Sequence, residues 1–149
     1  TTEKVIPLNE DLVVCYGDKP WVKQTTFRKI VDTFFKTKAD VVISTSVLKN
    51  PLKKGRILRE NGKFTCIREF KDANSSEKDI KEVNGGVYCF KSNNLFRLLK
   101  KVKNDNAANE YYLTSLFPLY LEESLKIETV FIEPKEILDV NSLDDLKQY

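Results

Sequence analysis

Histidine and methionine are both absent from this chain of 149 residues, and glycine occurs only five times. Without histidine, no imidazole is present to serve as a general base or a metal ligand near neutral pH. Because the sequence lacks an initiator methionine, we expect an excised, processed or truncated piece of a longer protein. No apolar run is long enough to span a membrane and no signal peptide is recognisable, which predicts a cytoplasmic protein.

Cysteine usage and net charge argue against a disulfide-stabilised protein, a zinc protein and a nucleic-acid-binding protein. The three cysteines, Cys15, Cys66 and Cys89, are far apart, and each lies in a strand-like run. This pattern predicts reduced core thiols rather than a disulfide framework or a zinc site. The net charge of +3 comes without a strong basic stripe, so nucleic acid is not an expected partner. The length, with 41% apolar and 32% charged residues, fits one globular domain.

Hydrophobic patterning predicts an α/β fold that opens with a βαβ unit. The expected strands cover residues 12–16, 41–47, 87–90 and 127–132, and the expected helices cover residues 25–37, 92–99 and 110–123. Asn61-Gly62 between two apolar runs predicts a β-hairpin. Paired Gly85-Gly86 predicts a bulge or a close approach of a ligand. Three further segments are expected to be a polar loop (71–79), a short strand or turn (136–141) and a helix cap (142–145).

The stretch from Leu12 to Pro20 contains the first candidate site residue. Its apolar run ends at Gly17, where the backbone turns freely, so the run predicts a buried parallel strand. Asp18 then lies just past the carboxyl end of that strand, where open α/β sheets bind ligands. A carboxylate there is suited to Mg²⁺ that carries substrate phosphates. The alternative is a loop aspartate that hydrogen-bonds its own turn.

Six short motifs follow one another along the chain with compatible gaps. They are Tyr16-Gly17-Asp18-x-Pro20, Gly55-Arg56-Ile57, Glu69-Phe70-Lys71-Asp72-Ala73, Glu82-Val83-Asn84-x-Gly86, Glu110-Tyr111-Tyr112-Leu113-Thr114 and Val140-Asn141. In that order the chain resembles the uridyltransferase domain of bacterial bifunctional N-acetylglucosamine-1-phosphate uridyltransferases and related sugar nucleotidyltransferases. The resemblance implies a Rossmann-like nucleotidyltransferase fold, of whose single domain residues 1–149 form the C-terminal portion. The expected sheet is mixed and mostly parallel, with an antiparallel hairpin.

The resemblance also implies an activity, which is Mg²⁺-dependent transfer of UMP from UTP to N-acetylglucosamine 1-phosphate. The products are pyrophosphate and UDP-N-acetylglucosamine, a cell wall precursor. The expected partners are therefore a nucleoside triphosphate and a sugar 1-phosphate, and a homo-oligomer is compatible with the resemblance. The family's metal ligands match Asp18, which would also be catalytic, and Asn141. Its substrate contacts match Tyr16, Gly17, Gly55, Glu69, Asn84 and Asn141.

Each of these residues also has a purely structural interpretation. Tyr16 suits a core aromatic with a hydrated hydroxyl. Glu69 suits a surface pair with a neighbouring cation, Asn84 a simple turn, and Asn141 the residue before a helix cap. Two functional alternatives stay open: a nucleotidyltransferase for another sugar or alcohol phosphate, or a non-catalytic regulatory or interaction module of this fold.

Several departures from the family pattern bear on these alternatives. The glycine-rich loop that holds the triphosphate in the family is not found here, so we expect this chain alone to be inactive. Lys54 replaces the aromatic or other residue often found before the glycine-arginine motif, and Asp139 stands where a glycine is common. Gly85 stands where a threonine is usual, and Ser115 where an aspartate is usual. These changes leave the identity of the sugar and of the base open.

Overall fold

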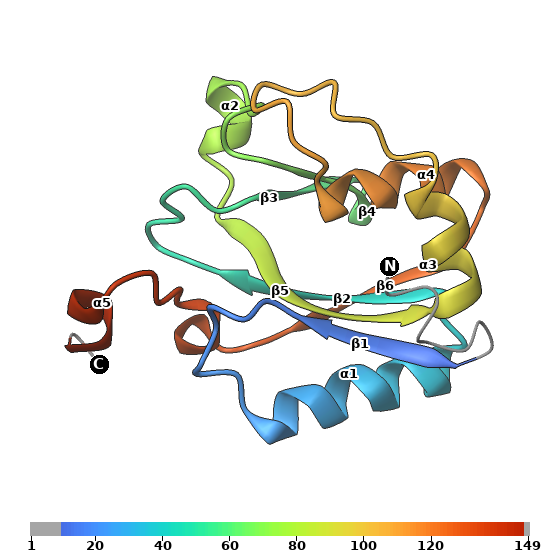
Figure 1. Ribbon diagram of the computed structural model, residues 1–149, viewed down its shortest axis with the longest axis horizontal. Coiled ribbons are helices and arrows are strands. Elements are labelled where there is room, and N and C mark those ends of the chain that lie inside the picture. The colour runs from blue at the N-terminus through green and yellow to red at the C-terminus, as the bar shows by residue number, and fades with distance from the viewer. Residues whose placement is uncertain (1–9, 148–149) are drawn as a thin grey trace.

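A β-sheet separates two groups of helices in the computed structural model, which describes residues 10–147 (Figure 1). Helix α1 covers one face of the sheet, and helices α3 and α4 cover the other. The six-stranded sheet confirms the predicted α/β class. In chain order the elements are β1 (Asp11–Cys15), α1 (Gln24–Thr37), β2 (Val41–Val47), β3 (Arg56–Glu60), β4 (Lys63–Arg68), α2 (Ser75–Lys78), β5 (Glu82–Lys91), α3 (Ser92–Leu99), the 3-10 helix η2 (Leu113–Ser115), α4 (Leu116–Glu122), β6 (Ile127–Phe131), the 3-10 helix η3 (Pro134–Ile137) and α5 (Leu143–Lys147).

One apolar core lies on each face of the sheet. Under α1, Ile30 and Phe34 pack on Val42, Val87 and neighbouring strand residues, as the helical spacing of the apolar residues predicts. On the opposite face the core joins α3 and α4 to the strands through Leu95, Leu98, Leu116, Phe117, Tyr120, Tyr88 and Phe90. Each fully buried side chain of this kind contributes about 1.5–3 kcal/mol to folding, so the two cores fix the sheet between its helices.

Strand β5 is the centre of the sheet and overturns the expected predominance of parallel pairing. It runs antiparallel to β1, to β2 and to β3, and only β2 and β6 form a parallel pair among the described strands. The strands β1 and β2 of the predicted βαβ unit are parallel to each other, but β5 lies between them. The sheet is therefore mixed and mostly antiparallel.

Strand β1 is not the buried strand that its apolar run predicts. Its residues alternate between exposed and half-buried, because the described residues pair it with β5 alone and place it at an edge of the sheet. Cys15, at the end of β1, is accordingly exposed, Cys66 is half-buried, and only Cys89 in β5 is buried. The three thiols are free, but the prediction that they lie in the core is correct only for Cys89.

One edge of β5 is shared by two strands, and a gap separates them. The beginning of β5 pairs with β3 through Val83, whereas residues 87–91 pair with β1. The other edge is occupied by β2 along most of its length. Asn84, Gly85 and Gly86 thus lie where neither β3 nor β1 pairs with β5, and the pairing with β2 is irregular beside them. The register shift between Ile43 and Thr45 confirms the predicted bulge.

The predicted hairpin is formed by β3 and β4. Asn61 and Gly62 both have positive φ angles, of 50° and 77°, which the two-residue hairpin turn requires. Other segments differ from their predictions. The expected loop 71–79 contains the short helix α2, because Asn74 and Glu77 form a reciprocal capping box.

The C-terminal part of the chain has less regular structure than its patterning predicts. The helix expected over 110–123 begins as η2 and continues as α4, and residues 134–137 form η3 instead of a strand. The predicted helix cap is confirmed, since the amide N–H of Asp145 donates to Ser142 Oγ and the amide N–H of Ser142 to the Asp145 carboxylate. No helix within residues 10–147 is long and apolar enough to cross a membrane.

Candidate functional site

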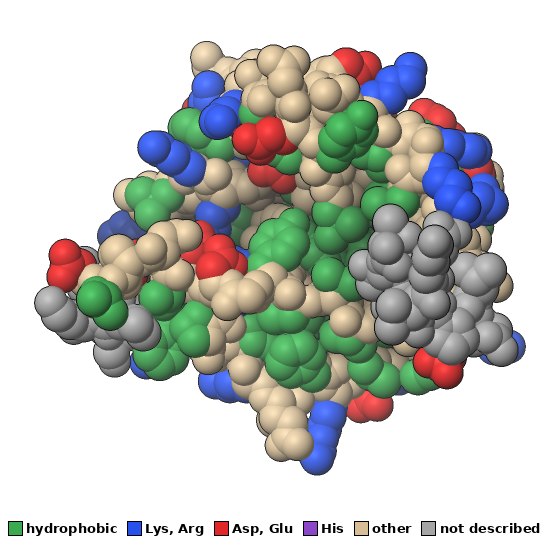
Figure 2. Space-filling model, in the orientation of Figure 1, with side chains coloured by type: hydrophobic (Ala, Val, Ile, Leu, Met, Phe, Trp, Pro, Cys, Tyr) green, Lys and Arg blue, Asp and Glu red, His purple; other side chains and the backbone are tan. Residues whose placement is uncertain are grey.

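A cleft of about 680 Å³ opens at the gap in the sheet. In Figure 2 the surface is hollowed between the part of the molecule that carries the β3–β4 hairpin and the part that carries β1. Of the residues predicted to form a site, all but Gly17 line this cleft: Tyr16, Asp18, Gly55, Glu69, Asn84 and Asn141. Gly17 is exposed and does not line it. The structure thus brings together residues from five separate segments of the chain.

Asp18 and the segment of Asn141 meet at one end of the cleft. The amide N–H of Val140 donates to the backbone carbonyl of Asp18 over 2.9 Å, which joins the two segments. Asp18 Oδ1 is buried and has no hydrogen-bond partner within the described chain. A buried carboxylate oxygen without a hydrogen-bond partner, in a cleft that the asparagine also lines, offers oxygen donors of the kind that a hard cation prefers. Asn141 also precedes the cap of α5, so its structural interpretation holds as well.

Buried Tyr88 connects two of the predicted residues and was missed by the sequence reasoning. Its hydroxyl accepts from Asn84 Nδ2 over 2.6 Å and lies within donating distance of Asn84 Oδ1 at 2.9 Å and of the Tyr16 hydroxyl at 3.2 Å. Asn84 Oδ1 in turn accepts from the amide N–H of Gly86 over 3.1 Å. The network fixes the orientation of the Asn84 amide at the wall of the cleft. Tyr88 lies within an apolar run, so the sequence gives no signal that separates it from a core aromatic.

The Glu69 carboxylate lines the cleft and has a single hydrogen-bond partner among the described residues. Thr114 Oγ1 donates to Glu69 Oε1 over 2.7 Å, which leaves Oε2 open to a ligand. Burial raises the pKa of the Glu69 carboxyl, the Thr114 hydrogen bond acts to lower it, and nearby Asp72 adds to the rise. The structural interpretation of Glu69 had Arg68 or Lys71 as its surface partner, but Arg68 pairs with Glu77 over 3.3 Å.

The glycines of the site allow close packing within the protein. A Cβ on Gly55 would lie 2.9 Å from Ile67 Cγ2 and 3.3 Å from both Glu69 carboxylate oxygens. A Cβ on Gly85 would collide with Ser44, and one on Gly86, which has a φ of 77°, would collide with Lys19. The groups that come close to the backbone of this glycine pair therefore include the side chains of Ser44 and Lys19.

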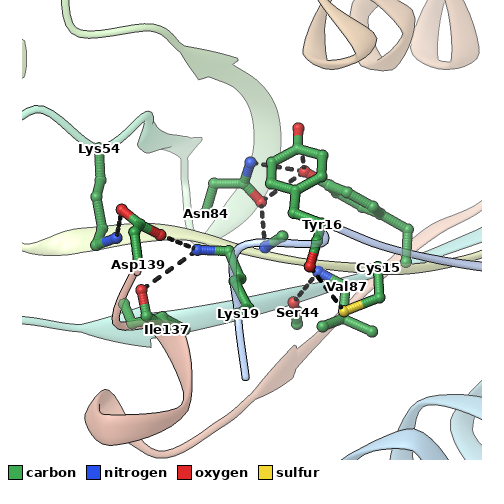
Figure 3. Close-up of polar contacts among 11 residues, drawn as sticks. Cys15, Tyr16, Lys19, Ser44, Lys54, Asn84, Val87, Ile137 and Asp139 are labelled. Carbon is green, nitrogen blue, oxygen red and sulfur yellow. Dashed lines mark hydrogen bonds and ion pairs between the residues drawn. The ribbon is translucent and has the colours of Figure 1, made fainter. Parts of the chain in front are cut away.

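Lys19, Lys54 and Asp139 form a charged cluster inside the cleft that the sequence reasoning also missed. Figure 3 shows the two ammonium groups meeting the carboxylate, with Lys19 Nζ 2.5 Å from Oδ1 and Lys54 Nζ 2.6 Å from Oδ2. Burial acts to raise the pKa of Asp139, but these two hydrogen bonds lower it overall. Burial lowers the pKa of Lys54, and its hydrogen bond to Asp139 opposes that change. Lys54 and Asp139 are two of the departures from the family pattern.

Arg56 holds the loop that carries Lys54 and Gly55. The guanidinium is buried and donates to the backbone carbonyls of Leu52, Lys54 and Lys78. A fork of fixed N–H donors is suited to several carbonyls at once. The Gly55-Arg56 motif was the sequence signal for this feature. In the structure its arginine anchors a loop beside a wall of the cleft.

No family model matches the chain. The bifunctional protein GlmU of Acinetobacter baumannii is 35% identical over 147 residues, which cover 99% of this chain and 32% of that protein. GlmU of Fervidobacterium nodosum is 41% identical over 137 residues, covering 92% and 29%. GlmU of Clostridium perfringens is 38% identical over 130 residues, covering 87% and 29%.

A solved structure shares the fold. It is that of a protein named as a glucose-1-phosphate thymidylyltransferase from Bacillus anthracis, in complex with a sucrose. The TM-score is 0.69 at 20% sequence identity, and the match covers 94% of this chain and 53% of that one. The expected Rossmann-like nucleotidyltransferase fold is thereby confirmed. The chain spans about a third of the length of the curated relatives that it matches. The chain is homologous to the matched region of the bifunctional GlmU proteins, and this homology confirms the resemblance indicated by its motifs.

Proposed function

We propose that this chain is the sugar-binding and metal-holding part of a nucleotidyltransferase that transfers UMP from UTP to N-acetylglucosamine 1-phosphate. The products are UDP-N-acetylglucosamine and pyrophosphate, and the reaction depends on Mg²⁺. One observation carries the proposal: motif residues from five segments converge on a single cleft. Homology to the bifunctional GlmU proteins and the fold of a sugar-1-phosphate nucleotidyltransferase support it. A cytoplasmic location and a homo-oligomer stay predictions.

The proposed reaction needs positioning and charge neutralisation more than acid–base chemistry. A phosphate oxygen of the sugar 1-phosphate attacks the α-phosphorus of UTP, and the bond to the pyrophosphate leaving group breaks. Both reactants are anions, so the site must bring them together and offset their charge. The nucleophile needs no general base, because a phosphate monoester has a second pKa of about 6 and is largely ionised near neutral pH. The absence of histidine is therefore compatible with the reaction.

Asp18 and Asn141 are the residues that would hold Mg²⁺. The buried, unpartnered Asp18 Oδ1 fits this role, and a hard cation prefers carboxylate and amide oxygens. Mg²⁺ usually takes only one or two protein ligands in sites of this kind, and substrate phosphates and water supply the rest. When bound, the cation supplies positive charge to the phosphates of both substrates.

Gly55, Glu69 and Asn84 form the wall at which the sugar would bind. Glu69 Oε2 is available to accept from a sugar hydroxyl or from the acetamido N–H. Asn84 keeps one amide N–H beyond its bond to Tyr88, whereas its Oδ1 lies within accepting distance of both Gly86 N–H and the Tyr88 hydroxyl. The lack of a side chain at Gly55 leaves room for the carboxylate of Glu69 and lets a ligand reach it.

The test is a pyrophosphate-release assay on the full-length protein, with UTP, dTTP and CTP each paired with several sugar and alcohol phosphates. We expect the highest kcat/KM for UTP with N-acetylglucosamine 1-phosphate, and turnover that stops when Mg²⁺ is chelated. Preference for CTP with an alcohol phosphate would contradict the proposal. Absence of turnover with every pair, together with retained binding of UDP-N-acetylglucosamine, would indicate a non-catalytic module. The 149-residue chain alone is expected to bind without turnover.

A further inference from the structure

The cluster of Lys19, Lys54 and Asp139 has no role in the reaction as set out above. It is nevertheless built into the cleft, since only 4% of the Lys19 side chain and 11% of the Lys54 side chain are exposed. Removing an ammonium from water is unfavourable unless the charge is matched. Here the Asp139 carboxylate alone bonds both ammonium groups, and Asp18 is the other carboxylate at this end of the cleft.

The cluster lies between the two parts of the proposed site. Lys19 follows the proposed metal ligand Asp18, and Asp139 precedes Val140, whose amide N–H donates to the carbonyl of Asp18. Lys54 precedes Gly55, whose carbonyl accepts from the amide N–H of Asn84 over 2.9 Å. The salt bridge between Lys54 and Asp139 therefore joins the metal end of the cleft to its sugar wall. A phosphate attached to a sugar at that wall and directed toward the metal must pass beside it.

The two ammonium groups differ in how many donors are still available. An ammonium group has three N–H donors. Lys19 uses two of them, on Asp139 Oδ1 and on the carbonyl of Ile137 at 3.3 Å. Lys54 uses one, on Asp139 Oδ2, and the described residues offer no other acceptor to it. Lys54 is thus the residue of the cluster that is equipped to bind an anion.

We propose that Lys54 binds the phosphate of the sugar 1-phosphate, and that Asp139 and Lys19 are positioning residues that fix the Lys54 ammonium. This inference rests on the proposed function and names a contact for its acceptor substrate. Asp139 holds Lys54 through one carboxylate oxygen, and Lys19 holds Asp139 through the other. The cluster gives the sugar phosphate a cationic partner that belongs to the protein, in addition to the metal.

Binding of three ligands to the full-length protein tests the assignment of Lys54. The ligands are N-acetylglucosamine 1-phosphate, neutral N-acetylglucosamine, and glucuronic acid, which carries a carboxylate but no phosphate. Lys54→Gln is expected to weaken binding of the sugar phosphate by about tenfold or more, the usual value for a lost charge-assisted hydrogen bond. Its affinity for the neutral sugar should stay the same, and Lys54→Arg should retain more affinity than Lys54→Gln. The matched control is Lys36→Gln on the exposed surface of α1.

The positioning residues are tested by kinetics. Asp139→Asn is expected to raise the KM for the sugar phosphate several-fold, with kcat and the KM for UTP little changed. A general structural role would instead lower stability and change both KM values.

Four results would overturn the inference. If Lys54→Gln binds the sugar phosphate as tightly as the wild type, Lys54 is not its ligand, and the proposed function still stands. If the variant loses the neutral sugar equally, Lys54 shapes the pocket rather than binding phosphate. If it loses glucuronic acid but not the sugar phosphate, the cluster recognises a carboxylate. If wild-type protein binds neither sugar, the proposed function fails together with the inference.

Discussion

At one end of the cleft, neutral hydroxyl groups hold Glu69 and Asn84, whereas at the other end two ammonium groups hold Asp139. We call these the sugar end (Gly55, Glu69 and Asn84) and the charged end (Asp18, Lys19, Lys54 and Asp139). The sugar end presents one carboxylate and one amide, with their orientation set by Thr114 and Tyr88. The charged end places two carboxylates and two ammonium groups on adjoining segments.

Under the proposed function, the sugar end would orient the substrate and the charged end would offset its charge. Neutral hydrogen bonds fix the direction of donors and acceptors, as recognition of sugar hydroxyls and an acetamido group requires. Charges in a half-buried cleft act on anions and lose less to salt than exposed charges do. A sugar 1-phosphate has one neutral and one anionic part, and the two ends of the cleft match them in that order.

The largest expected effect comes from Asp18→Asn at the charged end. Loss of a proposed metal ligand should lower Mg²⁺-dependent turnover of the full-length protein by about a thousandfold or more. Stability should change little, because Asp18 Oδ1 makes no hydrogen bond within the described chain. Pyrophosphate release and thermal unfolding measure the two effects. The matched control is Asp32→Asn on the exposed side of α1. Unchanged activity of Asp18→Asn would remove Asp18 from the site.

Glu69→Gln is the counterpart of Lys54→Gln and separates the two ends. It removes the acceptor charge at the sugar end, so it should weaken neutral N-acetylglucosamine and its 1-phosphate alike, by about tenfold. Calorimetric titration of both variants with both ligands gives four affinities. Equal losses in both variants for both ligands would mean that the ends are not functionally distinct.

Tyr88→Phe tests whether the sugar end is oriented by its hydroxyl network. The change removes the hydroxyl that contacts both Asn84 and Tyr16, so the free energy of unfolding should fall by about 1 kcal/mol. Affinity for the sugar should fall several-fold, while Mg²⁺ dependence is unaffected. Denaturant titration and binding measure these effects against Tyr111→Phe, whose side chain is 73% exposed. A stability loss without any change in sugar affinity would assign Tyr88 to the core alone.

The smallest expected effect is on the pH dependence of ligand binding, which should differ between the sugar end and the charged end of the cleft. As pH falls, Glu69 takes up a proton first, since its pKa is raised above 4.5 by burial. Sugar affinity should therefore decline at a higher pH than for an ordinary glutamate. The ion pairs of the charged end should persist to a lower pH, because the pKa of Asp139 lies below 3.8. As pH rises, the charged end should be affected first, because burial lowers the pKa of Lys54 below 10.5 and the lysine loses its charge earlier than an ordinary lysine.

Linkage predicts how these groups affect folding. The lowered pKa of Asp139 gives a stabilising contribution that is complete above its unfolded pKa and is lost as pH falls through the folded value. The raised pKa of Glu69 has the opposite sign, so ionisation of Glu69 opposes folding as pH rises. Affinity titrated against pH, together with unfolding measured at the same pH values, tests both signs. If acidification abolished phosphate binding at the charged end at a higher pH than sugar binding at the sugar end, the expected order of the two pKa values would be wrong.

The sequence predicted local structure well where local chemistry decides it. Helix α1 follows from the spacing of Ile30 and Phe34, and the hairpin follows from Asn61-Gly62. The ordered motifs also identified six residues that line the cleft, whereas the seventh, Gly17, does not line it. These features depend on residues close together in the chain or on a family pattern that spans it.

Features that depend on pairing between distant segments were not predictable. Lys19 and Asp139 are 120 residues apart, and nothing near either one indicates its partner. The apolar run of β1 suggested a buried strand because the sequence does not reveal that β5 lies between β1 and β2. Tyr88 lies in an apolar run and was indistinguishable from a core aromatic, and its partner Tyr16, which is 72 residues away, reaches it only in the folded sheet.

A crystal structure of the protein with N-acetylglucosamine 1-phosphate bound would show directly which end of the cleft holds the sugar and which holds the phosphate. We expect the sugar ring at the wall formed by Gly55, Glu69 and Asn84, with the phosphate within hydrogen-bond distance of Lys54 Nζ. A ligand in the opposite orientation, with its phosphate against Glu69, would contradict this expectation, and so would a ligand bound outside this cleft.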